Sequence, residues 1–291
     1  MNDKPNISDP GLLAQAQADA QRALAEDVGS GDLTAGLVDA NKDARAKLIV
    51  REYAILCGAP WAQAAVHALD PQARLRWHVA EGQWCKPGQV VLEIEGKARA
   101  LLSAERTALN FLQLLSAVAT RTAQYVTAVE GTRTQIVDTR KTLPGLRTAQ
   151  KYAVRSGGGY NHRMGLFDAV LIKENHIAAA GGIAPVMARA VSVTGQASFI
   201  QIEVETLAQL EEALNAGATM ILLDNMDLPI LREAVHLNDS KGERRAVLEI
   251  SGGVTLETVR ALAQTGVDRI SVGALTKDVK AVDFSMRFEG L

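Results

Sequence analysis

The sequence predicts an α/β protein in which an incomplete parallel α/β barrel of six strands follows an N-terminal α/β sandwich domain. After residue 131, six apolar segments alternate with helical patterns, as parallel strands joined by right-handed crossovers require. These segments are rich in β-branched residues and show little alternation of polar and apolar residues, which is typical of strands buried on both faces. The first 115 residues mix helix candidates and strand-like runs in another order, and this indicates a small separate sandwich.

Composition excludes several classes of protein. The chain has 291 residues, a hydrophobic content of 47%, a charged content of 22% and a formal net charge of −2. This near-neutral balance gives no general attraction to nucleic acid. No apolar run is long enough for a membrane span, and the polar N-terminus has no signal-peptide core. The two cysteines, Cys57 and Cys85, fit neither a disulfide framework nor a zinc site, so we expect a cytoplasmic protein with reduced thiols.

The N-terminal half contains one helical pattern at 11–26 and another at 59–69. Strand-like runs cover 44–58, 73–80 and 89–101. The segment 278–290 alternates polar and apolar residues and is expected to return as an edge strand of the same domain. We therefore predict a sandwich domain of residues 1–115 joined by 276–291, and a barrel domain of residues 116–275.

The piece HVAEGQWCKPGQVVLEIEG resembles the β framework of lipoyl and biotinyl carrier domains, which need a lysine at the tip of a tight hairpin. Lys97 follows Gly96, but its surroundings do not have the pattern of such a tip. A structural hairpin is the better interpretation.

A long helix is predicted to begin near Ser103, whose hydroxyl can cap it, and to stop at Gly131. Arg106 would then lie in the first turn, where the helix dipole disfavours a cation. This placement indicates an external anion as partner, although an ordinary surface arginine is the alternative.

Each of the six barrel segments ends in charged or glycine residues. The segments read QIVDTRK, DAVLIKENH, SFIQIEVE, TMILLDN, AVLEISGG and DRISVGA. Parallel α/β barrels collect their chemistry at the carboxyl ends of their strands. The sequence therefore predicts one pocket with several cations, two carboxylates and two glycine-rich loops. Such a pocket suits a ligand with phosphates, carboxylates and a divalent metal.

The first two segments supply the cations. Arg140 and Lys141 leave a buried strand together, and two cations there are costly unless anions accompany them. A solvated pair of loop charges is the alternative. Three glycines precede His162 and Arg163, and Lys173 ends the second strand. Lys173 has two functional interpretations, a contact to phosphate or a Schiff-base nucleophile.

Glu203 and Asp224 close the next two predicted strands. Two carboxylates facing one pocket can hold Mg²⁺ or ribose hydroxyls, and they can stabilise positive charge that develops on a sugar. The alternative is that they only form ion pairs with Lys141 and Lys173.

The last two segments end in short glycine loops that can bind a phosphate, as late barrel strands often do. Tight turning between strand and helix is the alternative. The residues of the two loops are Ser251, Gly252 and Gly253 in one, and Val272, Gly273 and Ala274 in the other.

Taken in order, these motifs resemble quinolinate phosphoribosyltransferase. The matching pieces are DTRKTLPGLR, KYAV, SGGGYNHRMGLFDAVLIKENHI, EVET, LLDN and LEISGGV, together with EDVGSGDLT and SAERTALNFLQ in the N-terminal half. The resemblance covers nearly the whole chain, and no functional position departs from the pattern.

The resemblance implies phosphoribosyl transfer from phosphoribosyl pyrophosphate to quinolinate with loss of CO₂, in a homodimer where Arg106 reaches the partner's site. It implies Mg²⁺ as cofactor, held with the ribose hydroxyls by Glu203 and Asp224. It also implies a 5′-phosphate bound by the loops 251–253 and 272–274, and Lys141, Glu203 and Asp224 as the catalytic residues. The implied basic wall consists of Thr139, Arg140, Lys141, His162, Arg163 and Lys173.

Three other functions stay open at this point. A Schiff-base aldolase would use Lys173, but would not need Arg140, Arg163 or paired glycine loops. A molybdenum-transport-associated relative of the fold would lack a settled substrate, and the intact NHR and KENH motifs argue against it. A nucleotide-binding sensor would bind tightly and release no pyrophosphate.

Overall fold

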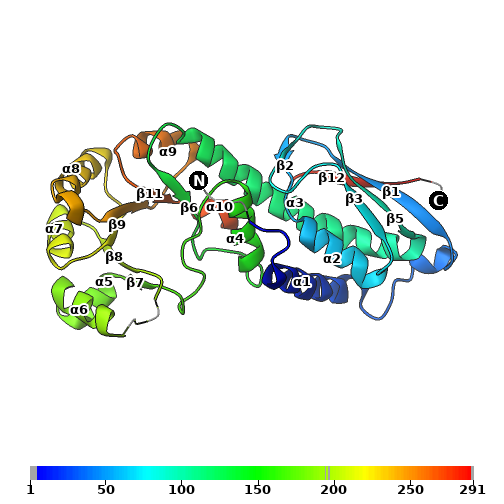
Figure 1. Cartoon of the computed structure of the whole chain (residues 1–291), viewed down its shortest axis with the longest axis horizontal. Coiled ribbons are helices and arrows are strands. Elements are labelled where there is room, and N and C mark those ends of the chain that lie inside the picture. The colour runs from blue at the N-terminus through cyan, green and yellow to red at the C-terminus, as the bar shows by residue number, and fades with distance from the viewer. Residues whose placement is uncertain (1–4, 194, 196, 290–291) are drawn as a thin grey trace. The chain divides into compact units, whose positions relative to one another are not determined.

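The computed structural model describes residues 5–193, 195 and 197–289. The chain forms two compact units (Figure 1). The first, here called the sandwich unit, comprises 1–122, 143–158 and 275–291 as far as these are described. The second, the barrel unit, comprises 123–142 and 159–274. No helix in the described part of the chain is long and apolar enough to cross a membrane.

The sandwich unit is built on a four-stranded antiparallel sheet with the order β12-β1-β5-β3. The bounds are Asp43–Val50 for β1, Arg74–Trp77 for β3, Val90–Lys97 for β5 and Phe284–Glu289 for β12. Thus β12 is the edge strand that the alternating C-terminal segment predicts. Strands β2 (Ala54–Ile55) and β4 (Trp84–Cys85) form a separate two-stranded antiparallel sheet. The strand β4 was not predicted from the sequence.

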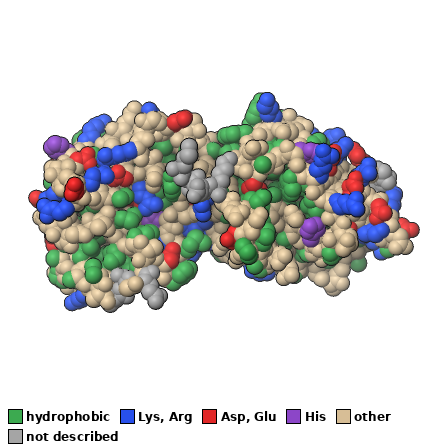
Figure 2. Space-filling model, in the orientation of Figure 1, with side chains coloured by type: hydrophobic (Ala, Val, Ile, Leu, Met, Phe, Trp, Pro, Cys, Tyr) green, Lys and Arg blue, Asp and Glu red, His purple; other side chains and the backbone are tan. Residues whose placement is uncertain are grey.

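Alternation along β1 separates a core face from a solvent face. Leu48 and Val50 are buried with the rest of the core, whereas Arg45 and Lys47 point outward. Arg45 pairs with Glu95 at 2.9 Å and Lys47 pairs with Glu289 at 2.7 Å. Figure 2 shows basic and acidic side chains interspersed over the right-hand part of the molecule. Such exposed pairs contribute little to stability.

Helices α1 (Pro10–Val28), α2 (Ala59–Leu69) and α3 (Ala98–Ala128) share a buried core with this sheet. Helix α4 (Arg147–Ser156) and a short 3₁₀ turn, η1 (Ala35–Leu37), belong to the same unit. Asp9 caps α1 by accepting the Leu12 N–H at 2.8 Å. The ring of Trp61 on α2 packs against Tyr152 on α4, with ring centroids 5.2 Å apart. Both cysteines are buried and free, as the sequence indicates.

The long helix α3 begins earlier than predicted, at Ala98 directly after β5. Ser103 therefore does not cap α3, because it lies several residues after the start of the helix. The Ser103 hydroxyl donates to Asp32 at 2.6 Å. The helix ends at Ala128, and Gly131 follows with a φ of 80°. Lys97 is the last residue of β5 and pairs with Asp43 at 2.7 Å, so it is not the tip of a carrier-type hairpin.

The barrel unit contains a six-stranded sheet with the order β6-β11-β10-β9-β8-β7 and parallel pairing throughout. Every one of the six predicted segments supplies a strand. The bounds are Gln135–Val137 for β6, Val170–Ile172 for β7, Ile200–Val204 for β8, Met220–Asp224 for β9, Val247–Ser251 for β10 and Arg269–Ser271 for β11.

The first strand, β6, pairs with the last, β11, and the sheet is open between β6 and β7. The chain between these two strands contains α4, which groups with the sandwich unit, so no barrel helix connects them. Tyr160 forms an isolated parallel bridge with Val137 and covers part of the β6 edge. The fold is the incomplete barrel that the sequence predicts.

The other barrel helices lie outside the sheet, as Figure 1 shows for α7, α8 and α9. Their bounds are Glu174–Ala180 for α5, Ile183–Val193 for α6, Leu207–Asn215 for α7, Leu228–Asp239 for α8 and Leu256–Ala263 for α9, with η2 at Gly242–Arg244. The short α10 (Ala274–Lys277) follows β11 and leads back to the sandwich unit.

Candidate active site

The strand register brings the predicted carboxylates to one face of the barrel sheet. Asp224 pairs in register with Ser251, and Glu203 pairs with Leu222, two residues before Asp224. Because alternate residues of a strand share a face, Glu203, Asp224 and Ser251 point to the same side. They lie at or next to the carboxyl ends of β8, β9 and β10.

Glu203 interacts with a cation and with a second acid at this edge. Its carboxylate lies 3.2 Å from the Lys173 ammonium, the residue that directly follows β7. Burial raises the pKa of Glu203, the Lys173 ammonium lowers it, and the Asp224 carboxylate raises it again. The predicted ion pair with Lys173 is therefore present, and Asp224 is close enough to repel Glu203.

The turn after β10 has a backbone that requires glycine. Gly252 and Gly253 have φ angles of 102° and 57°, a region that residues with a β-carbon rarely adopt. Asn225, directly after Asp224, also has a positive φ of 58°. The Asn225 and Asp224 side chains both border Gly252. A left-handed asparagine beside a glycine turn is a strained arrangement of the kind that clusters at functional sites.

The ends of β6 and β11 meet at Gly273. A β-carbon at Gly273 would lie 3.2 Å from Lys141 Cδ and 3.6 Å from the Thr139 hydroxyl. The same hydroxyl accepts the Lys141 N–H at 3.0 Å. Gly273 therefore allows the Lys141 side chain to cross the end of β11. Its neighbours differ: Val272 is buried, and Ala274 begins α10.

Arg140 and Arg163 form the second group of cations. Burial lowers the pKa of the Arg163 guanidinium, and the nearby Arg140 cation lowers it further. Asp168 opposes this effect and also orders the following loop, since it accepts the N–H groups of Met164 and Gly165 at 2.8 and 2.9 Å. Two partly buried arginines this close favour an anion between or beside them.

His162 is held from several sides. Its backbone N–H donates to Asp138 at 2.8 Å, and its Nε2 lies 2.8 Å from Gln201 Oε1. Its Nδ1 accepts the Arg163 N–H at 2.8 Å. The ring is buried, with 8% of the residue exposed, and packs edge-on against Phe199.

Arg106 is an exposed residue of α3 and belongs to the sandwich unit, whereas the other predicted site residues belong to the barrel unit. Because α3 begins at Ala98, Arg106 lies beyond the second turn. The argument from the helix dipole is therefore wrong, since that effect is confined to the first turn. A function for Arg106 in a second copy's site stays a prediction.

Four polar residues near the strand ends were missed by sequence reasoning. Gln201 and Glu249 share the inner face with Glu203 and Ser251, and Arg269 pairs in register with Glu249. Strict counting by two along each strand would have found them. Asn225 is the fourth; the LLDN motif contains it, but nothing in the local sequence indicates its left-handed backbone.

Two carboxylates are the acids available for a metal here. Among the described residues, no group of three or more His, Cys, Asp and Glu side chains is placed to hold an ion alone. Mg²⁺ commonly takes one or two carboxylates and completes its shell with water and substrate phosphates. The oxygen donors of Glu203 and Asp224 fit that mode of binding.

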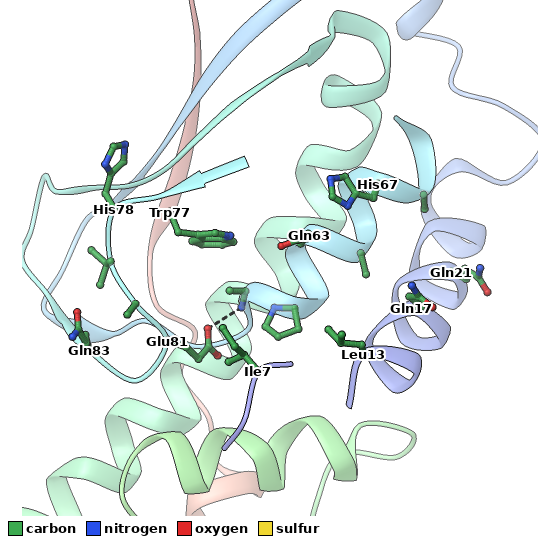
Figure 3. Close-up of a pocket in the computed structure, with 16 residues that line it drawn as sticks. Ile7, Leu13, Gln17, Gln21, Gln63, His67, Trp77, His78, Glu81 and Gln83 are labelled. Carbon is green, nitrogen blue, oxygen red and sulfur yellow. Dashed lines mark hydrogen bonds between the residues drawn. The ribbon is translucent and has the colours of Figure 1, made fainter. Parts of the chain in front are cut away.

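A cavity lies elsewhere, in the sandwich unit. It measures about 900 Å³ and is bordered by α1, α2 and residues 77–83 (Figure 3). Its polar lining includes Gln63, His67 and Glu81, and no Lys or Arg. The Glu81 carboxylate accepts the Gly58 and Ala59 N–H groups at 2.6 and 3.1 Å and so caps α2. This cavity does not suit a polyanion.

Comparisons with known proteins agree with the motifs. The N-terminal domain model of quinolinate phosphoribosyl transferase matches residues 32–116, and the C-terminal domain model matches residues 118–287. A probable nicotinate-nucleotide pyrophosphorylase [carboxylating] of Bacillus subtilis is 41% identical over 90% of this chain and 89% of its own. The Mycobacterium leprae nicotinate-nucleotide pyrophosphorylase [carboxylating] is 40% identical over 94% and 99%.

Solved structures agree as well. The nicotinate-nucleotide pyrophosphorylase from Francisella tularensis superposes with a TM-score of 0.89 at 40% identity, covering 95% of this chain and 97% of that one. Both domains of the family are matched, one after the other along the chain. The chain therefore belongs to the quinolinate phosphoribosyl transferase family.

Proposed function

We propose that the protein transfers the phosphoribosyl group of phosphoribosyl pyrophosphate to quinolinate, with decarboxylation. The products are nicotinate mononucleotide, pyrophosphate and CO₂, as in de novo NAD biosynthesis. The observation that carries the proposal is the clustering at one sheet edge of cations with two acids, Glu203 and Asp224. Membership of the family supports it.

Charge complementarity supports the assignment of substrates. Quinolinate carries two adjacent carboxylates and phosphoribosyl pyrophosphate is strongly anionic. A charge-assisted hydrogen bond contributes about 1.5–3 kcal/mol, so a site for both needs several cations. We assign quinolinate to a basic wall made of Thr139, Arg140, Lys141, His162, Arg163 and Lys173.

The sugar phosphate is assigned to the two acids and the two glycine loops at the same edge of the sheet. Glu203 and Asp224 would accept hydrogen bonds from the ribose hydroxyls, and their donor set fits Mg²⁺, which would neutralise pyrophosphate charge when bound. The turn at 251–253 and the residues 272–274 would take the 5′-phosphate. Gly252 and Gly253 leave the backbone there open to a close approach.

The reaction proceeds in two steps. The pyridine nitrogen attacks the anomeric carbon, the bond to pyrophosphate breaks, and pyrophosphate leaves with the electron pair. Positive charge develops on the sugar ring, and Glu203 and Asp224 stabilise it. The new pyridinium then accepts the electrons of the bond between C2 and its carboxylate, CO₂ leaves, and a proton from solvent takes its place. Transfer must come first, because the neutral ring cannot accept those electrons.

A Schiff-base function fits less well. The Lys173 side chain is 47% exposed and already paired with Glu203. A lysine nucleophile is usually activated by desolvation, which this position does not supply.

The test is to mix the purified protein with quinolinate, phosphoribosyl pyrophosphate and Mg²⁺ and to follow nicotinate mononucleotide by chromatography. We expect product, with one CO₂ for each pyrophosphate. Omission of phosphoribosyl pyrophosphate should abolish CO₂ release. CO₂ formed without it would contradict the order of steps, and no nucleotide under any condition would contradict the function.

We further propose a homodimer in which Arg106 completes the partner's site. Its exposure on α3 supports this. Mixed dimers of Arg106→Ala and Glu203→Ala subunits would hold about one intact site each and regain activity. If the mixture stays as inactive as either parent, Arg106 does not act in the partner.

A further inference from the structure

A buried polar cluster lies deeper on the inner face of the barrel sheet. It consists of His162, Gln201, Glu249 and Arg269 and is called the floor cluster below. Gln201 lies two residues before Glu203 on β8, and Glu249 lies two residues before Ser251 on β10. Arg269 pairs in register with Glu249. By strand alternation the side chains of Gln201, Glu249 and Arg269 lie beneath residues assigned to substrate.

The floor cluster is a poor way to stabilise a fold. Glu249 and Gln201 are fully buried, with 0% of each residue exposed. Within the described residues, both Glu249 oxygens, Gln201 Nε2 and Arg269 Nε lack a hydrogen-bond partner. The closest ion-pair contact between Arg269 and Glu249 is 3.9 Å. A buried ion pair with this geometry is often replaced by apolar residues without loss of stability, so another reason for its presence is needed.

His162 connects the floor cluster to the substrate-binding residues. Its Nδ1 accepts the Arg163 N–H at 2.8 Å, which requires that the ring proton sits on Nε2. That proton faces Gln201 Oε1 at 2.8 Å, with Glu249 Oε1 at 3.6 Å. The first is a hydrogen bond, and the second is an electrostatic contact beyond hydrogen-bond distance.

The geometry points to Gln201 and Glu249 as positioning residues that keep the His162 proton on Nε2 and thereby hold the backbone of Arg163 for its contact with a substrate carboxylate. In the other tautomer, an Nδ1–H would face the Arg163 N–H, and two donors would repel each other. The loop carrying Arg163 would then lose an anchor beside the proposed quinolinate site. The effect on quinolinate binding in this inference rests on the proposed function, whereas the tautomer of His162 does not depend on it.

The decisive variant is the double substitution E249M/R269M, which removes both charges and keeps similar side-chain volume. We expect it to fold with a Tm near that of wild type. We also expect the KM for quinolinate to rise about tenfold, which corresponds to the loss of one oriented hydrogen bond, with the KM for phosphoribosyl pyrophosphate changed less than about twofold. A double variant that folds and keeps the wild-type KM for quinolinate would overturn the proposal.

The single variant Gln201→Met removes only the 2.8 Å acceptor and leaves the ion pair in place. It tests the proposal even if the double variant does not fold, and its expected effect on the KM for quinolinate has the same direction. The matched control is Asn238→Ala. Asn238 is also fully buried in the barrel unit, but within the described part of the chain its side chain bonds only to the Ala246 backbone, at 2.8 Å. Stability should therefore fall with both KM values unchanged.

A spectroscopic measurement separates the tautomer from activity. Nitrogen NMR of ¹⁵N-histidine distinguishes a ring nitrogen that carries a proton from one that does not. It is recorded on free protein well above the ordinary imidazole pKa, with His162 assigned by comparison with His162→Gln. Wild type should show Nε2–H only, and Gln201→Met and E249M/R269M should show a mixture. If the KM rises while the tautomer stays pure, this account is wrong, whether or not the protein makes the proposed product.

Discussion

Two partly buried glutamates, one in each unit, show what distinguishes a structural acid from a functional one. Burial raises the pKa of Glu81 in the sandwich unit and of Glu203 in the barrel unit. Glu81 also borders the cavity of the sandwich unit. Yet its oxygens accept two N–H groups of its own chain, whereas Glu203 meets a half-exposed lysine and a second acid.

The partners, more than the cavity or the shifted pKa, therefore indicate function. Backbone N–H groups at the start of α2 are permanent partners, and Glu81 satisfies donors that would otherwise be unpaired. The Lys173 ammonium can exchange Glu203 for a ligand, and the repulsion between Glu203 and Asp224 is relieved when positive charge arrives. Glu203 and Asp224 can therefore accommodate a cation or an electron-poor sugar.

The largest expected effect is on turnover. Glu203→Ala should lower kcat by about 10²–10³-fold, because it removes one group that stabilises charge in the transition state. Substrate KM values should change much less. Steady-state kinetics with both substrates varied will measure this, and a loss confined to KM would show that Glu203 only binds.

Next in size is the loss of a cation that binds substrate. Arg140→Ala should raise the KM for quinolinate by roughly 10–100-fold, the loss expected of one charge-assisted hydrogen bond. Turnover at saturation should be less affected. An unchanged quinolinate KM would remove Arg140 from the proposed wall.

Glu81→Ala should reverse the pattern of Glu203→Ala. Loss of both acceptors at the start of α2 should lower Tm by about 2–5 °C, the effect of losing a helix cap. The kinetic constants should stay at wild-type values. Thermal unfolding and kinetics on the same samples check both halves, and a large fall in kcat would make Glu81 part of the chemistry.

The stability difference between wild type and Glu81→Ala should depend on pH. The folded-state pKa of Glu81 is raised above the ordinary value of 4.5, so its contribution is full below that pH and declines as pH rises through the folded value. The gap in Tm should thus widen on acidification. A gap that widens towards alkaline pH would show that the carboxylate is stabilised by the fold.

The smallest effect is expected on the solvent face of the four-stranded sheet. Arg45 and Glu95 form an ion pair with side chains 71% and 48% exposed. Arg45→Ala should change Tm by less than about 1 °C and leave the KM for quinolinate unchanged, since exposed pairs are screened by solvent. Arg45→Ala also serves as the arginine control for Arg140→Ala. A clear rise in the KM for quinolinate in this control would contradict the distinction between the exposed sheet face and the site.

The parts predicted from sequence are those with a repeating signal. The six barrel strands could be found because each is a short apolar run ending in polar residues, and the charged residues after them share one edge by topology. The start of α3 was missed because the strand-like run continues past the end of β5 to residue 101. Gly96 lies within β5, and no turn separates Lys97, the last residue of the strand, from Ala98, the first residue of the helix. Strand β4 has two residues and gives no periodic signal.

Other features depend on contacts between distant residues. Nothing local indicates that α4 packs with the sandwich unit, where Gly157 approaches Ala119 too closely for any β-carbon. The cap that Glu81 supplies to α2 joins residues more than twenty positions apart. The floor cluster is the exception, because alternation along β8 and β10 places Gln201 and Glu249 on the inner face and could have revealed them.

The most direct measurement is a crystal structure of the protein with quinolinate bound. We predict that both ring carboxylates lie within hydrogen-bond distance of the wall that includes Arg140, Arg163 and Lys173, at the carboxyl edge of the six-stranded sheet. Density for the ligand in the cavity beside Glu81, or anywhere away from that edge, would contradict the account.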